Sequence, residues 1–256
     1  MSTGVRRGVM APGVRRAVTS RVDDDDTLRI EWPEPDDGGQ VTWRHVETGQ
    51  EHTGAGLAGL RPGIWMASCR GEPVATDDPG FSLDGLVVYA GRPRTREVRA
   101  FRTTAGTLGL TVREVAPYVE VTGVGCEDGV IEVEGVLAYG VPVEGPARLV
   151  AVARKGSDPV SAPGVFRGRG FSGSVPIGPM AGGQVRRRMF WDLLVEVGGE
   201  RLPLAARLDD IADKKTKVRF PAQHVGARHA GQVRVRPYYT DTDSLAVALT
   251  AEEESA

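Results

Sequence analysis

Val233-Arg234-Val235-Arg236, a loop, and Leu245-Ala246-Val247-Ala248-Leu249 carry the clearest signal of architecture in this chain, because the same arrangement occurs earlier. The earlier copy is Val98-Arg99-Ala100-Phe101-Arg102, a loop, and Leu108-Gly109-Leu110-Thr111-Val112. Alternating side chains followed by a short loop and a second apolar run are typical of two antiparallel strands. Each copy therefore predicts a β-hairpin.

A second matching pair lies upstream of the hairpins. Trp65-Met66-Ala67-Ser68-Cys69-Arg70-Gly71-Glu72 and Trp191-Asp192-Leu193-Leu194-Val195-Glu196-Val197-Gly198-Gly199-Glu200 both read as a Trp-led strand that ends in a Gly-Glu turn. We therefore expect two similar β-modules. The features that the copies share are expected to be scaffold. A function is expected at residues 236–244, where the second copy gains tyrosines and aspartates.

The composition agrees with a chain built of strands. Its 256 residues include 34 glycines and 17 prolines, which divide short runs rich in Val, Leu, Ile and Thr. We predict an all-β protein of two tandem immunoglobulin-like β-sandwich domains. The expected parts are a disordered, basic then acidic tail (1–26), a first sandwich (27–116), a second sandwich (117–250) and a frayed end (251–256).

The local patterns predict individual strands in both modules. The expected strands are 27–32, 41–46, 64–69, 86–90, 97–103, 107–114, 130–136, 147–153, 164–171, 189–197, 201–207, 216–220, 232–239 and 244–250. One stretch, 208–217, departs from this pattern because its acids precede its lysines. That order suits a short helical turn, whose dipole favours acids first and bases last.

Charge and cysteine content limit the classes of function. The formal net charge of -2 gives no field that draws the chain to nucleic acid, so no nucleic-acid partner is expected. No stretch reaches the roughly 20 apolar residues of a membrane span, and a cytoplasmic location is expected. Arginines 6, 7, 15, 16 and 21 leave peripheral contact with the inner face of the membrane open. Cys69 and Cys126 are read as reduced, buried thiols, with a disulfide as the alternative.

No catalytic or metal-binding pattern stands out. Ser172 lies in Gly170-Phe171-Ser172-Gly173-Ser174, which lacks the Gly-x-Ser-x-Gly frame of a nucleophile elbow. His224 and His229 are five residues apart without an evident third ligand, and His45 reads as a strand residue. There is no Gly-rich loop of the phosphate-binding type. We predict no catalytic residues, no metal and no cofactor.

Two clusters are candidates for binding. Arg186-Arg187-Arg188 reads as a solvated strand edge, with a polyanion site as the alternative. The denser cluster joins tyrosines, carboxylates and an arginine, a set that recognises a sugar or a peptide. Its candidate ligand-binding residues are Arg236, Tyr238, Tyr239, Asp241 and Asp243. The structural alternative is that a tyrosine caps the core and the aspartates form turn hydrogen bonds.

The second half also resembles a known group of proteins. The residues concerned are 190–195 (FWDLLV), 202–204 (LPL), 207–210 (RLDD), 218–221 (VRFP), 236–240 (RPYYT) and 244–247 (SLAV). They resemble the β-sandwich accessory segments of actinobacterial glycosyltransferases and CDP-glycerol glycerophosphotransferases of the teichoic-acid type. The resemblance implies a place in surface-polysaccharide or wall-polymer biosynthesis beside a transferase.

The chain departs from complete members of that group. It has no Rossmann-like nucleotide-binding half and no catalytic histidine pair, so no catalytic residue carries over. Asp241-Thr242-Asp243 spells D-x-D, but it lies in an expected hairpin loop, where it would hold a cation only weakly.

These observations lead to a main hypothesis and two alternatives. The main one is a non-catalytic accessory or binding protein that recognises a glycan, a wall-polymer intermediate or a partner glycosyltransferase. The first alternative is a transferase acting on an activated sugar or polyol phosphate, with Arg236, Asp241 and Asp243 assisted by phosphate contacts from Lys214, Lys215 and Lys217. The second is a structural module whose strand edges pair with a partner.

Overall fold

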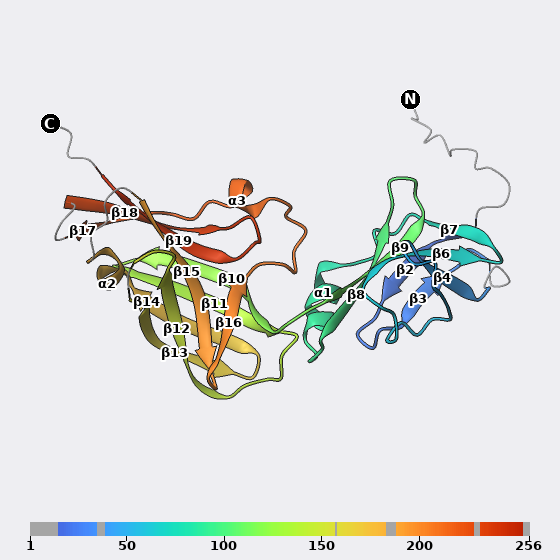
Figure 1. Cartoon of the computed structure of the whole chain (residues 1–256), viewed down its shortest axis with the longest axis horizontal. Helices are drawn as coiled ribbons and strands as arrows, with labels where there is room; N and C mark the ends of the chain where they lie inside the picture. The colour runs from blue at the N-terminus through green and yellow to red at the C-terminus, as the bar shows by residue number, and fades with distance from the viewer. Residues whose placement is uncertain (1–14, 35–38, 157, 183–187, 228–230, 253–256) are drawn as a thin grey trace, which may run out of the picture. The chain divides into compact units, whose positions relative to one another are not determined.

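The computed structural model describes residues 15–34, 39–156, 158–182, 188–227 and 231–252. Most of these residues lie in strands, which confirms the mostly-β prediction. Two compact units divide the chain: Met1–Tyr89 with Arg94–Val115, and Ala90–Pro93 with Ala116–Ala256 (Figure 1). No helix within the described ranges is long and apolar enough to cross a membrane.

The first unit contains a seven-stranded sheet and a separate β2–β3 hairpin. The sheet runs β1-β7-β6-β4-β5, and the β8–β9 hairpin joins it because β9 pairs with β6. The elements are β1 (Arg15–Ala17), β2 (Thr19–Val22), β3 (Leu28–Glu31), β4 (Val41–His45), β5 (Glu51–Thr53), β6 (Gly63–Cys69), β7 (Glu72–Thr76), α1 (Leu83–Ala90), β8 (Arg96–Arg102) and β9 (Leu108–Glu114).

The second unit contains a ten-stranded sheet. Seven strands close into a ring, β12-β13-β14-β11-β10-β16-β15, because β12 also pairs with β15, and β19-β18-β17 extend from β15. The elements are β10 (Tyr118–Glu127), β11 (Val130–Ala138), β12 (Gly145–Ala153), β13 (Val160–Arg167), β14 (Gly170–Pro176), α2 (Ile177–Ala181), β15 (Arg188–Val197), β16 (Glu200–Ala205), α3 (Lys214–Lys217), β17 (Gln223–Ala227), β18 (Gly231–Tyr239) and β19 (Leu245–Ala251).

Both units use the same pairing scheme, which confirms the hairpins and the Trp-led turns. In each unit the Trp-led strand pairs with the second strand of the closing hairpin, with Trp65 opposite Leu110 and Trp191 opposite Val247. Leu110 and Val247 are the third residues of the two matching apolar runs. The strand that follows each Trp-led strand also pairs in parallel with the first strand of its unit. These pairs are β7 with β1 and β16 with β10.

The turns at the ends of the two closing hairpins are alike in detail. The Thr103 N–H donates to the Thr107 carbonyl at 2.9 Å, and the Thr240 N–H donates to the Ser244 carbonyl at 2.9 Å. The fourth turn residue is Gly106 with φ +80° in the first unit and Asp243 with φ +57° in the second. Asp243 therefore occupies a left-handed position that glycine fills in the other copy.

Each unit has its own apolar core. The first is built around Trp43 and Trp65, and the second around Phe166 and Trp191, all 0 or 1% exposed. Cys69 and Cys126 are both buried and free, as expected for reduced thiols.

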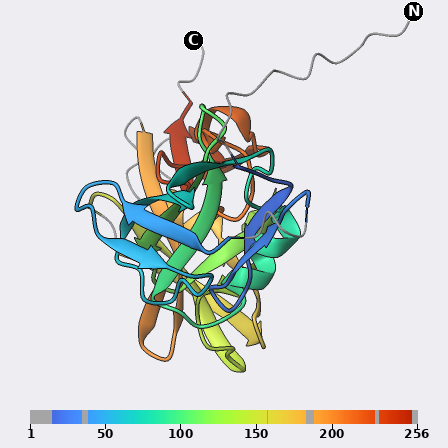
Figure 2. The ribbon, with the colours of Figure 1, turned by 90° about the vertical axis from the view of Figure 1, so that its right-hand side faces the viewer.

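Three predicted strands are wrong. Residues 86–90 belong to α1, the teal coil in Figure 2, in which Leu86, Tyr89 and Ala90 are buried on one side. The Ser82 hydroxyl accepts the Gly85 N–H at 3.1 Å, an N-terminal cap that stabilises this helix. The strand expected at 216–220 is absent. A helical turn, α3, occurs within 208–217 as expected, but its first turn contains none of the acids that the expected dipole arrangement requires. Residues 164–171 span the turn between β13 and β14.

The disordered tail expected for 1–26 is too long. Residues 15–22 form β1 and β2, because the β1 backbone pairs with β7 and the Asp78 carboxylate accepts the Ser20 N–H at 3.1 Å. Arg16 and Arg21 form ion pairs with Asp77 and Asp78. Residues 1–14, with Arg6 and Arg7, lie outside the described residues, as do 253–256.

Candidate functional site

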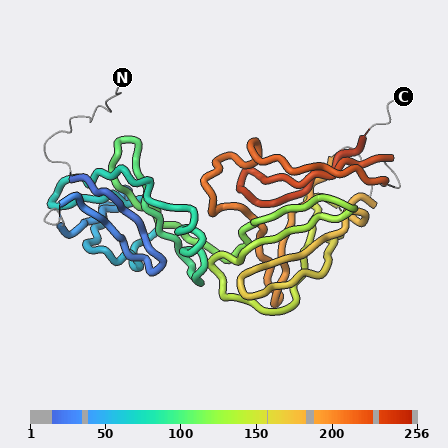
Figure 3. Tube along the Cα trace, turned by 180° about the vertical axis from the view of Figure 1, so that it is seen from behind, coloured from blue at the N-terminus to red at the C-terminus, as the bar shows by residue number. Residues whose placement is uncertain are grey.

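The tyrosines of the predicted site lie on opposite faces of β18, which belongs to the red hairpin in Figure 3. Successive residues of a strand alternate between faces, so Arg236 and Tyr238 face outward while Tyr239 faces the core. Tyr239 is 6% exposed and packs against Phe220, with 5.5 Å between ring centroids. Tyr239 therefore caps the core, which was the structural alternative.

The outward side of β18 continues across β19 to β15. Residues that pair directly across strands share a face. Three rows result, which we call the outer face: Arg234, Thr250 and Arg188; Arg236, Ala248 and Phe190; and Tyr238, Ala246 and Asp192.

Two aromatic rings meet over the middle strand of the outer face. The centroids of Phe190 and Tyr238 are 5.9 Å apart in an edge-to-face arrangement. Ala246 and Ala248, which lie between them on β19, are 0 and 7% exposed. Because alanine side chains are short, the rings from β15 and β18 can approach each other and cover them.

Arg154 ties this aromatic pair to a carboxylate. Its Nη2 donates to Asp192 Oδ1 at 2.7 Å and its Nε to Oδ2 at 3.1 Å, a bidentate ion pair. The guanidinium carbon lies 5.6 Å from the Phe190 ring centroid, and that of Arg188 lies 4.9 Å from it. Burial raises the pKa of Tyr238, and the charge of Arg154 opposes that shift. The phenol therefore stays protonated and able to donate a hydrogen bond.

A pocket of about 440 Å³ adjoins the aromatic pair. Hydroxyl and charged groups converge on it from three segments, because Arg154, Asp192 and the closing turn all line it. In that turn, Thr240 and Thr242 contact each other through their hydroxyls at 3.1 Å. The residues that line the pocket are Val152, Arg154, Asp192, Leu193, Leu194, Pro203, Thr240, Thr242, Ser244 and Leu245.

Arginines crowd the other end of the outer face. Burial lowers the pKa of Arg236, and the nearby charges of Arg234, Arg219 and Arg188 lower it further. Among the described residues, none of these four arginines is within 4.0 Å of a carboxylate oxygen.

The nearby carboxylates have basic partners of their own. Asp192 pairs with Arg154, Glu252 with His224 at 2.9 Å, and Asp241 with Lys215 at 2.9 Å. Within the described residues, positive charge therefore exceeds negative charge at the arginine end of the outer face.

The predicted phosphate-contacting lysines do not come together. Lys214 is buried, and its Nζ lies 2.7 Å from Asp209 and donates to the Ile211 carbonyl at 3.0 Å. Lys215 is held by Asp241, and Lys217 is exposed at the end of α3. The loop pair Asp241 and Asp243 is likewise divided between an ion pair and the left-handed turn position.

Other predicted groups contribute less. His224 lies on β17 and pairs with Glu252, while His229, Arg186 and Arg187 fall outside the described residues. In the described part of the chain, no three or more His, Cys, Asp or Glu side chains lie together as a metal-binding group.

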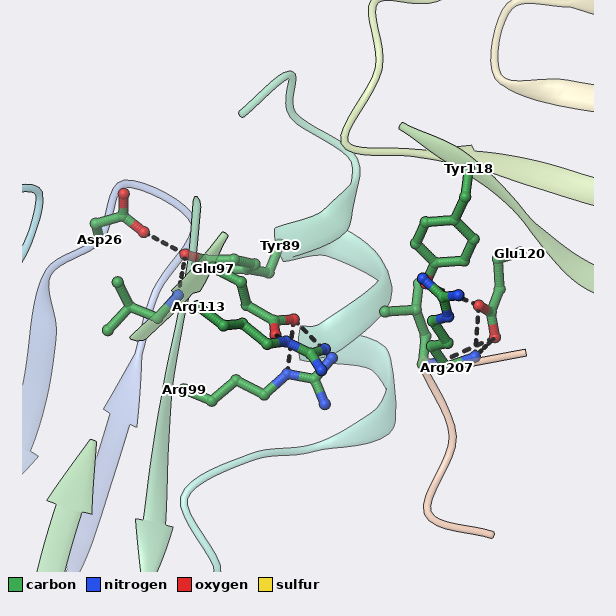
Figure 4. Close-up of polar contacts among 10 residues, drawn as sticks. Asp26, Tyr89, Glu97, Arg99, Arg113, Tyr118, Glu120 and Arg207 are labelled. Carbon is green, nitrogen blue, oxygen red and sulfur yellow. Dashed lines mark hydrogen bonds and ion pairs between the residues drawn. The ribbon is translucent and has the colours of Figure 1, made fainter. Parts of the chain in front are cut away.

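Two buried carboxylates that the sequence analysis did not identify have structural partners (Figure 4). Glu97, 1% exposed, accepts hydrogen bonds from Arg99 at 2.7 Å and from Arg113. Glu120 accepts the backbone N–H of Arg207 at 2.8 Å and the hydroxyl of Tyr118 at 2.9 Å. Burial raises the pKa of Glu120, and these donors counteract the rise. Both carboxylates are fully engaged within their own units.

Comparison with known proteins gives a weak structural similarity. No protein-family model and no curated protein matches the chain. Among solved structures, S. aureus TarS and its 217–571 fragment each align with a TM-score of 0.40 and 13% identity over 66% of this chain. The chain spans 32% of the first and 50% of the second.

Proposed function

We propose that this chain is a non-catalytic binding protein of cell-envelope polysaccharide or wall-polymer biosynthesis. Its second unit holds a glycan or polymer intermediate at the outer face and the adjoining pocket. The two units are immunoglobulin-like β-domains in tandem, and the pairing scheme that they share supports the duplication. The protein acts in the cytoplasm beside a partner glycosyltransferase.

The pocket lined by Arg154 and Asp192 is the observation that carries this proposal. Its volume of about 440 Å³ is that of a small-ligand site. A sugar or polyol presents many hydroxyl groups, which both donate and accept hydrogen bonds. The Asp192 carboxylate accepts them, the Arg154 guanidinium donates them, and the hydroxyls of Thr242 and Ser244 do both.

Two further points support the assignment. The resemblance of residues 190–195 and 236–240 to transferase accessory segments favours a wall-polymer pathway. A non-catalytic role is supported by Lys214 and Lys215, because Asp209 and Asp241 hold them instead of leaving them to converge on a phosphate.

Titration with purified wall-polymer fragments tests the proposal. Tyr238→Ala removes the phenol beside the pocket, and we expect about tenfold weaker binding, or ~1.4 kcal/mol. The matched control is Phe101→Ala, the corresponding position of the first hairpin, since Phe101 pairs opposite Gly109 as Tyr238 does opposite Ala246. Binding should survive the control change. No binding of any fragment by the unaltered protein, together with no capture of a glycosyltransferase, would contradict the proposal.

A further inference from the structure

Among the charged positions at which the two closing hairpins differ, one reverses the sign of the charge. Register places Glu97 opposite Arg113, one pair before Val98 and Val112. In the second hairpin Arg234 lies opposite Thr250, one pair before Val235 and Leu249. Arg234 therefore occupies the position of Glu97.

This exchange places two like charges where the first face has an ion pair. In the first unit Glu97 accepts hydrogen bonds from Arg99 and from Arg113. Arg236 in the second unit corresponds to Arg99, but Arg234 provides a like charge in place of the carboxylate. In the first face two arginines share a carboxylate that the fold supplies, whereas among the described residues the second face supplies none within 4.0 Å of its arginines.

The arginine cluster is not explained by stability. Like charges gathered on one face of a sheet repel one another. Arg188 and Arg219 add to the pair on β18, and the described residues supply no carboxylate within 4.0 Å of any of the four. An external anion would relieve this repulsion. Guanidinium groups suit phosphate oxygens because they form two parallel hydrogen bonds with them.

The spacing favours an anion chain over a single ion. Side chains two residues apart on a strand, such as Arg234 and Arg236, start about 7 Å apart. Arg188 lies two strands away from Arg234, a separation of about 10 Å. One phosphate would contact all of these groups only if the guanidinium groups converged on it against their mutual repulsion, whereas a chain with repeated phosphates can pair with each of them separately.

The aromatic side chains argue against nucleic acid as that chain. Proteins that bind single strands stack bases on free aromatic faces. Here the guanidinium groups of Arg154 and Arg188 lie over the Phe190 ring, and Tyr238 contacts its edge.

We infer that Arg188, Arg219, Arg234 and Arg236 bind a non-nucleotide polymer or oligomer with repeated phosphate groups. This inference deepens the proposed function, on which it rests, by assigning the phosphate-binding end of the same surface. Sugar or polyol groups of the ligand would occupy the pocket, and its phosphates would lie along the arginines.

Calorimetric titration with linear inorganic polyphosphate tests the arginine site separately. Arg234→Glu places a carboxylate beside Arg236, as Glu97 lies beside Arg99, and should weaken binding at least about tenfold. Arg44→Glu changes net charge equally at an exposed position of the first unit and should alter affinity less than about twofold. Raising the salt concentration from about 0.05 to about 0.3 M should weaken binding by the unaltered protein.

The outcomes separate this inference from the proposed function. Polyphosphate binding that Arg234→Glu reduces and Tyr238→Ala does not supports the arginine site, even if phosphate-free glycan fragments fail to bind and the pocket is refuted. The inference is overturned if polyphosphate does not bind, if Arg234→Glu and Arg44→Glu behave alike, or if single-stranded oligonucleotides bind more tightly than polyphosphate of equal charge.

Discussion

The outer face of the second unit and the corresponding face of the first are built on equivalent hairpins. They differ in which groups pair with their arginines. In the first, Glu97 engages Arg99 and Arg113. In the second, arginines occupy the face without an acidic partner among the described residues, next to a hydroxyl-lined pocket. Because the two units share a scaffold, the face of the first unit shows which charged contacts the fold itself forms. The arginines of the second unit lack the corresponding contact among the described residues.

The two units also differ in the segment that precedes the closing hairpin. Between β7 and β8 the first unit has α1, whose Tyr89 hydroxyl accepts the Val98 N–H at 2.9 Å. Between β16 and β18 the second unit has α3 and β17, and Lys215 of α3 reaches Asp241 of the turn. The shared strands carry different insertions, and these determine what covers each hairpin.

The largest effect should come from the tryptophans, where the units are most alike. Trp65→Ala and Trp191→Ala each remove a fully buried indole, and we expect each to destabilise its unit by about 3 to 5 kcal/mol. Chemical unfolding followed by probes in each unit measures this. If one substitution cost much less than the other, the two residues would not hold equivalent places in their cores.

Glu97→Gln should have the next largest effect, on the first unit only. It removes the charge that Arg99 and Arg113 share, and loss of a partner in a buried ion pair costs about 3 kcal/mol. The control is Glu114→Gln, at an exposed position of β9, which should leave the unfolding midpoint unchanged. A similar midpoint for both variants would show that Glu97 is not needed to close its face.

Trp65 and Trp191 should differ in how much unfolding free energy is lost when the indole N–H is removed. The Trp65 N–H donates to the Arg61 carbonyl at 3.0 Å, whereas that of Trp191 is buried without a partner within the described residues. Trp65→Phe should therefore cost about 1 kcal/mol more than Trp191→Phe, because it breaks a hydrogen bond. Equal losses of unfolding free energy in urea would mean that the Trp191 N–H is also satisfied.

The smallest effect concerns the turn. Asp243→Gly puts at φ +57° the residue type that the first unit has at Gly106, and we expect stability to change by less than about 1 kcal/mol, in the favourable direction. Affinity for wall-polymer fragments should not change. A marked loss of affinity would assign Asp243 to the ligand site and show that its role extends beyond the turn.

The sequence was sufficient for features that depend on local alternation. The hairpins, the Trp-led turns and the outward placement of Arg236 and Tyr238 follow from a period of two. Alternation also separates Tyr238 from Tyr239, although the sequence analysis placed both in the ligand site. Residues 86–90 were misassigned because Val87 and Val88 favour strands, while the cap that supports a helix lies earlier, at Ser82.

Features that depend on strand register could not be predicted from the sequence. Phe190 meets Tyr238, and Arg154 meets Asp192, only because β12, β15 and β19 pair as they do. Lys214 likewise looks exposed in a run of lysines, but folding buries it against Asp209. The exchange of Glu97 for Arg234 also depends on register, because matching Val98-Arg99 to Val233-Arg234 in the sequence sets Arg234 against Arg99 instead.

NMR titration of the isotope-labelled full chain with linear polyphosphate provides a single comparison of the two faces. The account predicts shifts concentrated on β15, β18 and β19, with Arg234, Arg236 and their neighbours most affected and Arg99 and Phe101 unchanged. Shifts of equal size on β8 and β9, or none on β18, would show that the loss of the neutralising carboxylate did not create a binding surface.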